Sequence, residues 1–416
     1  MDLTDWLKDV SSPSHIWFVK RLSANDTGAN HTHQAGTYIS KDFLFSILPA
    51  LNDKKKKNPD AWFDLYTDSH KDVKKKVRVI WYNNRFHENP KGGRNEVRIT
   101  NFGGKGSPLQ NHENTGALVV YAFLLNESGN AINCRVWVCR DVAEEELVEN
   151  VTGSIDPGEM KAWSSDEAAH PLIFRKKKVK TAKLEETCWL DEHEIPLPWL
   201  SSFPSALEII EHTIKLRPEA DLPVDKRLMR RRECEFNIFK SLELAVELPY
   251  IKAGFSCIDD FLAKAQTILQ RRKARSGRSL ELHTKYIFTE EGLVEGKDFS
   301  HGPESEKGKR PDFLFPSESH YKNASFSSEK LRMLAVKTTC KDRWRQILNE
   351  ADRIETKHLL TLQEGVSENQ FIEMTNAHVK LVVPYGIVTK YPKKIQPYLL
   401  SLEGFIKEIN ECISSK

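Results

Sequence analysis

The sequence predicts two domains, a mostly β domain followed by an α/β domain. Its 416 residues are too many for one comfortable hydrophobic core, which favours two domains or more. Short β-branched and aromatic segments dominate residues 15–175, whereas helically spaced segments that alternate with strand-like runs dominate from about residue 200. We therefore expect domains at 1–175 and 204–416, joined by a linker or hinge at 176–203.

The composition indicates an ordinary globular protein, with 39% hydrophobic and 29% charged residues. A net charge of +3 does not identify a nucleic-acid binder. Any inference of DNA binding must therefore rest on local clusters of charged and polar residues. No apolar run approaches the roughly 20 residues of a membrane span, and the N-terminus lacks signal-peptide features. Seven cysteines without a Cys-x-x-Cys pair argue against a disulfide framework or a zinc ribbon. We expect a cytoplasmic protein that binds no membrane.

Alternating apolar segments predict the strands of the N-terminal domain. They lie at 16–20, 77–82, 118–123 and 134–139. Turn-rich stretches such as 101–106 separate them. This pattern is typical of an antiparallel β barrel or sandwich.

The C-terminal pattern alternates helices and strands. We expect helices at 226–249, 256–274, 342–356 and 398–413, and strands at 312–315, 331–337, 358–363 and 379–384. Such alternation predicts an α/β domain with a mixed sheet. The stretch before it has a basic run at 175–178 followed by prolines, which is typical of a linker.

The residues with the most chemical content lie at the ends of two predicted strands. Pro311-Asp312 enters one strand and Lys337 ends the next. Phosphodiester hydrolysis needs acidic oxygens to hold a divalent cation and a lysine to steady the attacking water. Ala335 stands where the simple Glu-x-Lys pattern has its acid, so we expect Glu350, on the following predicted helix, to replace it. Glu281 is a further candidate. The alternative is that these are ordinary surface carboxylates.

Lys341-Asp342-Arg343 follows Lys337 closely. In a major groove, Lys and Arg favour guanine acceptors and a carboxylate accepts from the cytosine amino group, so the triplet suits G·C pairs. On an α-helix, Arg343 and Glu350 would share a face because they are seven residues apart. The alternative is a helix whose N-terminus is capped by Asp342.

A second candidate for reading DNA lies in the β domain. If residues 94–100 form a strand, Arg94, Glu96 and Arg98 project from one face, and Val97 and Ile99 from the other. Two arginines around a glutamate suit G·C edges in a groove. The alternative is an exposed strand face whose charges neutralise one another.

These residues resemble those of the EcoRII-type restriction endonucleases. In the C-terminal half the similarity runs through 271–273, Gly277, 279–283, 311–317, 331–350 and 362–367. In the N-terminal half it runs through 20–29, His33-Gln34, 94–96, 107–110 and 113–118. Both domains are covered, and only 150–225 matches loosely.

The resemblance implies a division of labour between the two domains. The N-terminal domain resembles an effector domain, a DNA-binding β pseudobarrel that binds one copy of the target and relieves autoinhibition. The C-terminal domain resembles the PD-(D/E)xK restriction-endonuclease fold and would form the homodimer that cuts double-stranded DNA. Asp312 and Glu350 would hold Mg²⁺, with Lys337, Glu281 and Tyr321 completing the catalytic centre.

The family's recognition residues map onto both domains. In the catalytic domain the recognition residues would be Lys341, Asp342 and Arg343. In the effector domain the DNA-contacting positions would be His33, Tyr38, Lys91, Arg94, Glu96 and Arg98. Two departures lie here. Val97 stands where the relative has a basic residue, and Gly92-Gly93 precede Arg94 where a lysine is expected, with Lys91 one position early.

Family membership predicts a type IIE enzyme with the target 5′-CCWGG, 5′-phosphate products and a cognate DNA methyltransferase in the same restriction-modification system. The residues themselves support only G·C pairs at the edges of the site. Two other functions remain open. One is a sequence-specific DNA-binding regulator with an inactive nuclease domain, and the other is a structure-specific repair nuclease.

Overall fold

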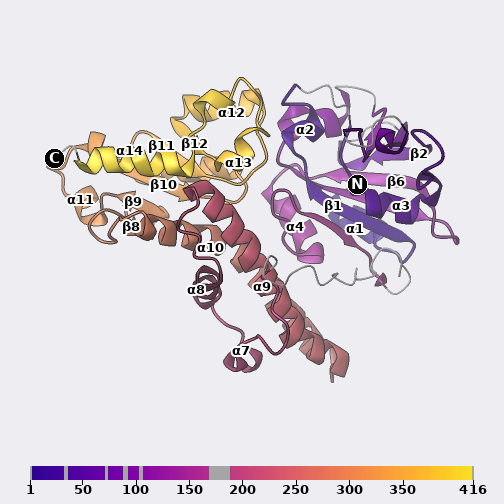
Figure 1. Ribbon diagram of the computed structural model, residues 1–416, viewed down its shortest axis with the longest axis horizontal. Helices are drawn as coiled ribbons and strands as arrows, with labels where there is room; N and C mark the ends of the chain where they lie inside the picture. The colour runs from indigo at the N-terminus through magenta and orange to yellow at the C-terminus, as the bar shows by residue number, and fades with distance from the viewer. Residues whose placement is uncertain are drawn as a thin grey trace. The chain divides into compact units, whose positions relative to one another are not determined.

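The computed structural model describes residues 2–31, 36–70, 74–87, 92–102, 106–167 and 188–414. The chain divides into two compact units (Figure 1). The first comprises Met1–Lys177, Gln363–Glu373 and Val388–Pro397, and the second comprises Lys178–Leu362, Met374–Ile387 and Tyr398–Lys416. Each unit is described by itself.

The first unit is built on a seven-stranded sheet of order β4-β3-β2-β6-β5-β1-β7. Its strands are β1 (His15–Arg21), β2 (Asp60–Thr67), β3 (Lys75–Tyr82), β4 (Glu96–Thr100), β5 (Leu118–Leu125), β6 (Ala131–Val138) and β7 (Met160–Trp163). Neighbouring strands are antiparallel except β2 and β6, which run parallel. The prediction of a mostly antiparallel β region is confirmed, and all four predicted segments coincide with strands.

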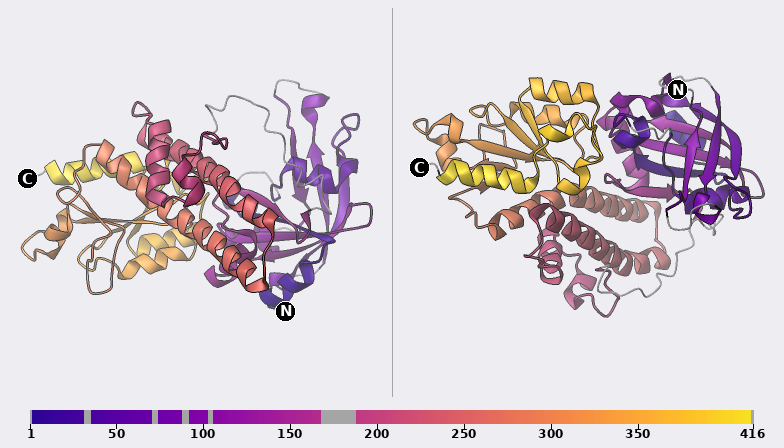
Figure 2. Two further views of the ribbon diagram at one scale, coloured as in Figure 1. Left: turned by 90° about the horizontal axis from the view of Figure 1, so that it is seen from below. Right: turned by 45° about the horizontal axis from the view of Figure 1, so that its top comes forward.

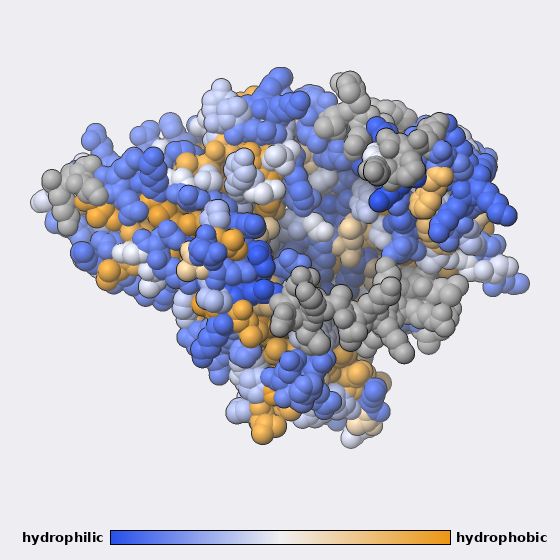
Figure 3. Space-filling view, viewed as in Figure 1, coloured by the Kyte–Doolittle hydropathy of each residue, from blue (hydrophilic) through white to orange (hydrophobic). Residues whose placement is uncertain are grey.

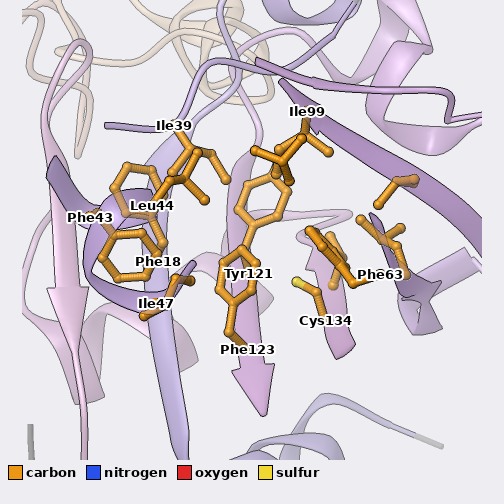
Figure 4. Close-up of a cluster of buried hydrophobic side chains, with 14 of the residues drawn as sticks. Phe18, Ile39, Phe43, Leu44, Ile47, Phe63, Ile99, Tyr121, Phe123 and Cys134 are labelled. Carbon is orange, nitrogen blue, oxygen red and sulfur yellow. The ribbon is translucent and has the colours of Figure 1, made fainter. Parts of the chain in front are cut away.

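Both faces of this sheet are covered, because alternate residues of its central strands enter two different cores. On one face Phe18 of β1 and Tyr121 and Phe123 of β5 pack against Phe43 and Leu44 of the helix α3 (Lys41–Ile47), as Figure 4 shows. On the other face the helices α1 (Leu3–Val10) and α4 (Val142–Thr152) cover the sheet. Strand β5 is therefore an almost continuous apolar run, as expected of a strand buried on both faces. The short helix α2 (Ala24–Thr27) also belongs to this unit.

The second unit contains a five-stranded sheet of order β12-β11-β10-β9-β8. Its strands are β8 (Ser300–His301), β9 (Phe313–Phe315), β10 (Arg332–Val336), β11 (Lys357–Leu360) and β12 (Val379–Val382). Strands β8, β9 and β10 are antiparallel, whereas β10, β11 and β12 are parallel. The predicted α/β domain with a mixed sheet is confirmed.

An aromatic cluster fixes the two long helices nearest this sheet. Phe288 of α10 (Ile258–Glu290) packs edge-on against Phe313 and Phe315 of β9, and Phe315 packs against Phe405 of α14 (Leu402–Ser414). The other α-helices described after residue 188 are α7 (Leu197–Ser201), α8 (Ala206–Leu216), α9 (Val224–Ala253), α11 (Glu318–Lys322), α12 (Glu368–Asn376) and α13 (Tyr385–Val388). Most of α12 belongs to the first unit. None of the described helices is long and apolar enough to cross a membrane.

Helices α9 and α10 form an antiparallel hairpin whose seam is charged (Figures 1 and 2). Glu243 of α9 pairs with Arg272, and Glu247 with Arg271, at 2.6 and 2.5 Å. The loop end of the hairpin instead exposes large apolar side chains, and Figure 3 shows hydrophobic residues over this part of the unit. They are Tyr250, Ile251, Ile258, Phe261 and Leu262.

One expectation about the cysteines is wrong. Cys188 and Cys234 form a disulfide that joins the segment before α7 to α9. Both sulfurs lie in a small apolar cluster with Leu190, Ile195 and Ile238. A separation of 46 residues is not a spacing motif, so only the folded packing of this cluster brings the two thiols together.

Candidate active site

Antiparallel pairing brings Asp312 and Lys337 together. Asp312 directly precedes β9 and Lys337 directly follows β10, and in an antiparallel pair the start of one strand lies beside the end of the other. The Lys337 Nζ lies 3.6 Å from Asp312 Oδ2, which also accepts a 2.6 Å hydrogen bond from the backbone N–H of Val336. The strand order therefore places a carboxylate and an ammonium at one edge of the sheet.

Glu350 lies in the same region, but the segment that carries it does not have the α-helical conformation that the sequence predicts. Residues 343–349 form the 3-10 helix η9 (Arg343–Asn349), and Glu350 follows it in an extended conformation with φ −96°. The predicted helix at 342–356 is wrong, and so is the face shared by Arg343 and Glu350. Glu350 lies beyond the end of η9 in extended backbone, so no helical face relates its side chain to that of Arg343.

Burial perturbs both candidate metal-binding carboxyls. Burial raises the pKa of Glu350 to about 7, while Lys337 lowers it and Asp312 raises it further. Burial likewise raises the pKa of Asp312, against the opposing effects of Lys337 and the Val336 N–H, with Glu281 adding to the rise. Lys337 lies 3.6 Å from Asp312, and the charges of both act on Glu350, so the structure brings these three groups into one region, while Glu281 acts on Asp312.

Glu281 has a partner that sequence reasoning missed. It lies on α10, and its Oε1 is 2.5 Å from His301 Nε2 of β8. The His301 ring stacks on Phe313, the residue after Asp312, with centroids 5.2 Å apart. His301 carries no sequence signal, because only the pairing of β8 with β9 brings it to this site.

Tyr321 lies on α11 and is buried. Its hydroxyl donates to Glu306 Oε1 and accepts a 3.1 Å hydrogen bond from the backbone N–H of Arg353. Burial, together with the Glu306 carboxylate, raises the pKa of Tyr321 above its ordinary value. The structure therefore engages this hydroxyl with the turn that follows Glu350.

The triplet expected to read DNA lies between β10 and η9. Lys341 is buried, with its Nζ 3.9 Å from Asp342 Oδ2, whereas Asp342 and Arg343 are half-buried. Arg345 Nη1 lies 4.0 Å from the other oxygen of Asp342. The N-terminus of η9 is in the described part of the chain, and Asp342 makes no side-chain capping hydrogen bond there, which removes the capping alternative.

In the β domain, four of the six expected DNA contacts come together around β4. Val97 and Ile99 are fully buried, as the strand alternation predicts. Glu96 pairs with Arg98 at 3.0 Å, and the Arg98 guanidinium lies 5.7 Å from the ring centre of Tyr38. Arg98 is itself buried, so it does not project freely from the strand. Arg94 is exposed and lies 5.7 Å from the Tyr82 ring centre. His33 and Lys91 lie outside the described residues.

The centre offers few protein ligands for a cation. Among the described residues, no group of three or more His, Cys, Asp or Glu side chains is arranged to hold a metal ion. This agrees with Mg²⁺ chemistry, since Mg²⁺ keeps several waters and usually takes one or two carboxylates together with substrate phosphates.

Comparison with known proteins covers nearly the whole chain. A family model described as EcoRII C terminal matches residues 239–406, and another, described as restriction endonuclease EcoRII, N-terminal, matches residues 11–167. The type II restriction enzyme EcoRII of Escherichia coli is 38% identical over 408 residues, covering 97% of this chain and 96% of that protein.

Two solved structures also match, both of metal-depleted Ecl18kI with uncleaved DNA, modified in one of them. Each is 16% identical with a TM-score of 0.43, covers 52% of this chain, and is itself covered to 80 or 81%.

The family matches assign the N-terminal β domain and the C-terminal α/β domain with its mixed sheet to the two halves of EcoRII. Identity of 38% along nearly the full length also confirms the resemblance that the sequence motifs indicate. The chain therefore belongs to the EcoRII family of type II restriction enzymes, which are site-specific deoxyribonucleases.

Proposed function

We propose that this enzyme hydrolyses both strands of a short palindromic DNA site in a Mg²⁺-dependent reaction centred on Asp312, Glu350 and Lys337. The observation that carries this proposal is the 3.6 Å approach of Lys337 Nζ to Asp312 Oδ2 at the sheet edge. Ion pairs of this kind also occur without catalysis, but here a second carboxyl, that of the half-buried Glu350, lies close enough to respond to the charges of both Lys337 and Asp312.

The residues present fit a hard divalent cation. Both Asp312 and Glu350 offer oxygen, which Mg²⁺ prefers. Oε2 of Glu350 is buried and has no hydrogen-bond partner among the described residues, so a ligand position is left open. When bound, Mg²⁺ would act as a Lewis acid on the phosphate and lower the pKa of a bound water.

The protein's own groups would divide the remaining work. Asp312 and Glu350 would hold the cation, and the Val336 N–H fixes the orientation of the Asp312 carboxylate. The Lys337 ammonium would orient the attacking water and offset negative charge as the phosphorane forms. Glu281, held by His301, would assist from the Asp312 side. Attack that releases the 3′ oxygen leaves a 5′-phosphate on the product.

For the target we propose 5′-CCWGG, which is supported by the family resemblance and by the Lys341-Asp342-Arg343 triplet beside the centre. The N-terminal domain would bind a second copy of the site and relieve an autoinhibited state, as in a type IIE enzyme. Arg94, Glu96 and Tyr38 lie around β4 where such contacts are expected. His33 and Lys91 remain expectations from the resemblance.

A homodimer in the cytoplasm would complete the activity. One centre cuts one strand, so a palindromic site calls for two subunits related by a two-fold axis. A restriction enzyme also needs a cognate methyltransferase that protects the host DNA. We propose that this partner acts on the same site without binding the enzyme.

The test is digestion of a plasmid that carries several CCWGG sites, with wild-type protein and Lys337→Ala, in Mg²⁺ or in EDTA, followed by sequencing of the fragment ends. We expect discrete Mg²⁺-dependent fragments that end at one motif with 5′-phosphates, and none with the variant. If wild-type protein retards the DNA in a gel but leaves it intact, the regulator function replaces the nuclease. Cleavage at junctions alone would favour the repair nuclease.

A further inference from the structure

The turn that follows Glu350 is held by side chains from two other segments, Ser305-Glu306 and the helix that carries Tyr321. Residues 351–354 form this turn, and Ala351 has a positive φ of 51°. The N–H of Ala351 donates to Ser305 Oγ at 3.3 Å, and the N–H of Asp352 donates to Glu306 Oε1 at 3.0 Å. With the Tyr321 hydroxyl accepting from Arg353, three consecutive backbone donors are bound by side chains. We call this set of contacts the Glu350 clamp.

The carbonyls of the same turn are bound by one buried cation. Lys357, the first residue of β11, is only 6% exposed. Its ammonium donates to the carbonyl oxygens of Ala351 and Ile354 at 2.7 and 2.6 Å. Burying a lysine on a strand costs solvation energy, so contacts of this kind need a compensating role in structure or function.

The Glu350 clamp holds the backbone next to a carboxylate oxygen that has no hydrogen bond of its own among the described residues. The Glu350 N–H bonds to Ile347 of η9, but its Oε2 has no hydrogen-bond partner within the described residues. The position of that carboxylate is therefore set by the backbone on either side of it. On the downstream side, that backbone is fixed by Glu306 and Lys357.

We propose that Glu306 and Lys357 are positioning residues for Glu350, holding the turn at 351–354 so that the Glu350 carboxylate meets the metal at the distance that cleavage requires. This inference rests on the proposed function, in which Glu350 is a metal ligand. Partners behind metal ligands typically contribute about 10- to 100-fold to metal affinity or activity.

The chain offers a matched control on the same turn. Lys309 Nζ pairs with the Asp352 carboxylate at 2.7 Å, but this pair lies at the surface, with the Lys309 side chain 34% and that of Asp352 58% exposed, and it joins two side chains only. Lys309→Met and Lys357→Met are thus the same chemical change on either side of one turn. An exposed ion pair contributes little, so Lys309→Met should behave as wild type.

A second pair of variants, at Glu306, distinguishes the loss of a hydrogen bond from a general loss of stability. Glu306→Gln keeps a side-chain oxygen that can accept from Tyr321 and Asp352, whereas Glu306→Met removes it. Both pairs would be measured in the full-length chain for the Mg²⁺ concentration that gives half-maximal cleavage and for kcat. Binding of the CCWGG duplex in Ca²⁺ and thermal unfolding would be measured in parallel.

We expect Lys357→Met and Glu306→Met to need about tenfold more Mg²⁺ and to lose about 10- to 100-fold in kcat. Both should keep duplex binding, and Glu306→Gln and Lys309→Met should stay near wild type. If Lys357→Met fails to fold, the Glu306 pair decides alone. Unchanged Mg²⁺ dependence in Glu306→Met overturns the clamp while leaving the nuclease intact. If wild type does not cleave at all, the proposed function falls and this inference falls with it.

Discussion

At the scale of single residues, the buried ion pair of Lys20 and Asp26 is the clearest electrostatic feature of the β unit. The Lys20 ammonium lies 2.7 Å from Asp26 Oδ2, and both side chains are almost completely buried. Asp26 also accepts hydrogen bonds from the backbone N–H groups of Ser23 and Tyr38. Burial alone would raise the pKa of Asp26, but Lys20 and these hydrogen bonds hold it below its ordinary value.

Replacing Lys20 should therefore destabilise the protein strongly. We expect Lys20→Met to lower the free energy of unfolding by about 3–5 kcal/mol at pH 7, because an uncompensated charge is left buried. Urea titration monitored by tryptophan fluorescence would measure it. Lys8→Met is the control, since the Lys8–Asp5 pair is exposed and should contribute almost nothing. Equal stabilities of the two variants would contradict the buried pair.

The pH dependence of this pair has a definite sign. Because the pKa of Asp26 is lower in the folded state, its stabilising contribution is fully present above the unfolded-state value of about 3.9. It is lost as pH falls through the lower folded-state pKa. The stability gap between wild type and Lys20→Met should accordingly narrow below about pH 4, measured by repeating the urea titrations. If the stability difference between the two proteins widens toward acidic pH, the pKa of Asp26 is not lowered in the folded state.

The sequence predicts some residues of the candidate site well because their positions follow from strand pairing. Asp312 and Lys337 border two consecutive strands, so one antiparallel pairing suffices to bring them together. His301, Glu306 and Lys357 could not be predicted in the same way. His301 and Glu306 meet their partners through packing between segments that are distant along the chain. Lys357 bonds to a nearby turn, but a lone His, Glu or Lys carries no sequence pattern.

At the scale of elements, the 3-10 helix η9 shows where periodicity misleads. Trp344 and Ile347 are its buried residues, and they are three apart, which suits a three-residue turn as well as an α-helix. A short segment offers too few apolar positions to separate the two periods. The position of the Glu350 carboxylate depends on whether the preceding segment is an α-helix or a 3-10 helix. The sequence could therefore nominate Glu350 as a metal ligand but could not place its side chain.

The hairpin of α9 and α10 shows a second reason why apolar periodicity fails to predict where a helix ends. The sequence predicts helices at 226–249 and 256–274, yet α10 continues to Glu290. Beyond residue 274 the side of α10 that faces α9 is partly polar: Arg275 and Ser279 bind Glu235, which is buried. Apolar periodicity cannot follow a helix whose seam is made of paired charges.

The disulfide of Cys188 and Cys234 belongs to this scale, because it fixes the segment before α7 to a long helix. Without reductant, the denatured protein should titrate with five thiols, those of Cys134, Cys139, Cys257, Cys340 and Cys412, and with seven after reduction. Ellman titration would measure this. Closing a loop of 46 residues constrains the unfolded chain, so Cys234→Ser should lower the stability of the oxidised protein by about 4 kcal/mol.

The reduced protein provides the control for that comparison. Wild type and Cys234→Ser should then differ much less in stability, since neither chain carries the cross-link. Seven reactive thiols in the untreated protein would contradict the disulfide of Cys188 and Cys234.

At the scale of the whole molecule, the division into two compact units shows which segments contribute to each core. The cluster around Cys188 includes Leu190 and Ile195, so residues that the sequence assigns to a linker at 176–203 contribute to the core of the second unit. Low periodicity and prolines predict a linker, but a few apolar anchors are enough to bury part of such a segment. A truncated catalytic domain should therefore begin no later than Cys188.

The two-site behaviour that we propose is a property of the full chain. If the N-terminal domain restrains the nuclease until it binds its own copy of the target, a plasmid with one CCWGG site should be cut at least about tenfold more slowly than one with several. That ratio corresponds to a coupling free energy of about 1.4 kcal/mol, within the usual range for allosteric proteins. A short CCWGG duplex added in trans should raise the single-site rate, and a duplex with a scrambled sequence should not. A chain that begins at Cys188 should cut both plasmids equally. Equal rates for the full chain on both plasmids would remove autoinhibition and leave an ordinary single-site enzyme.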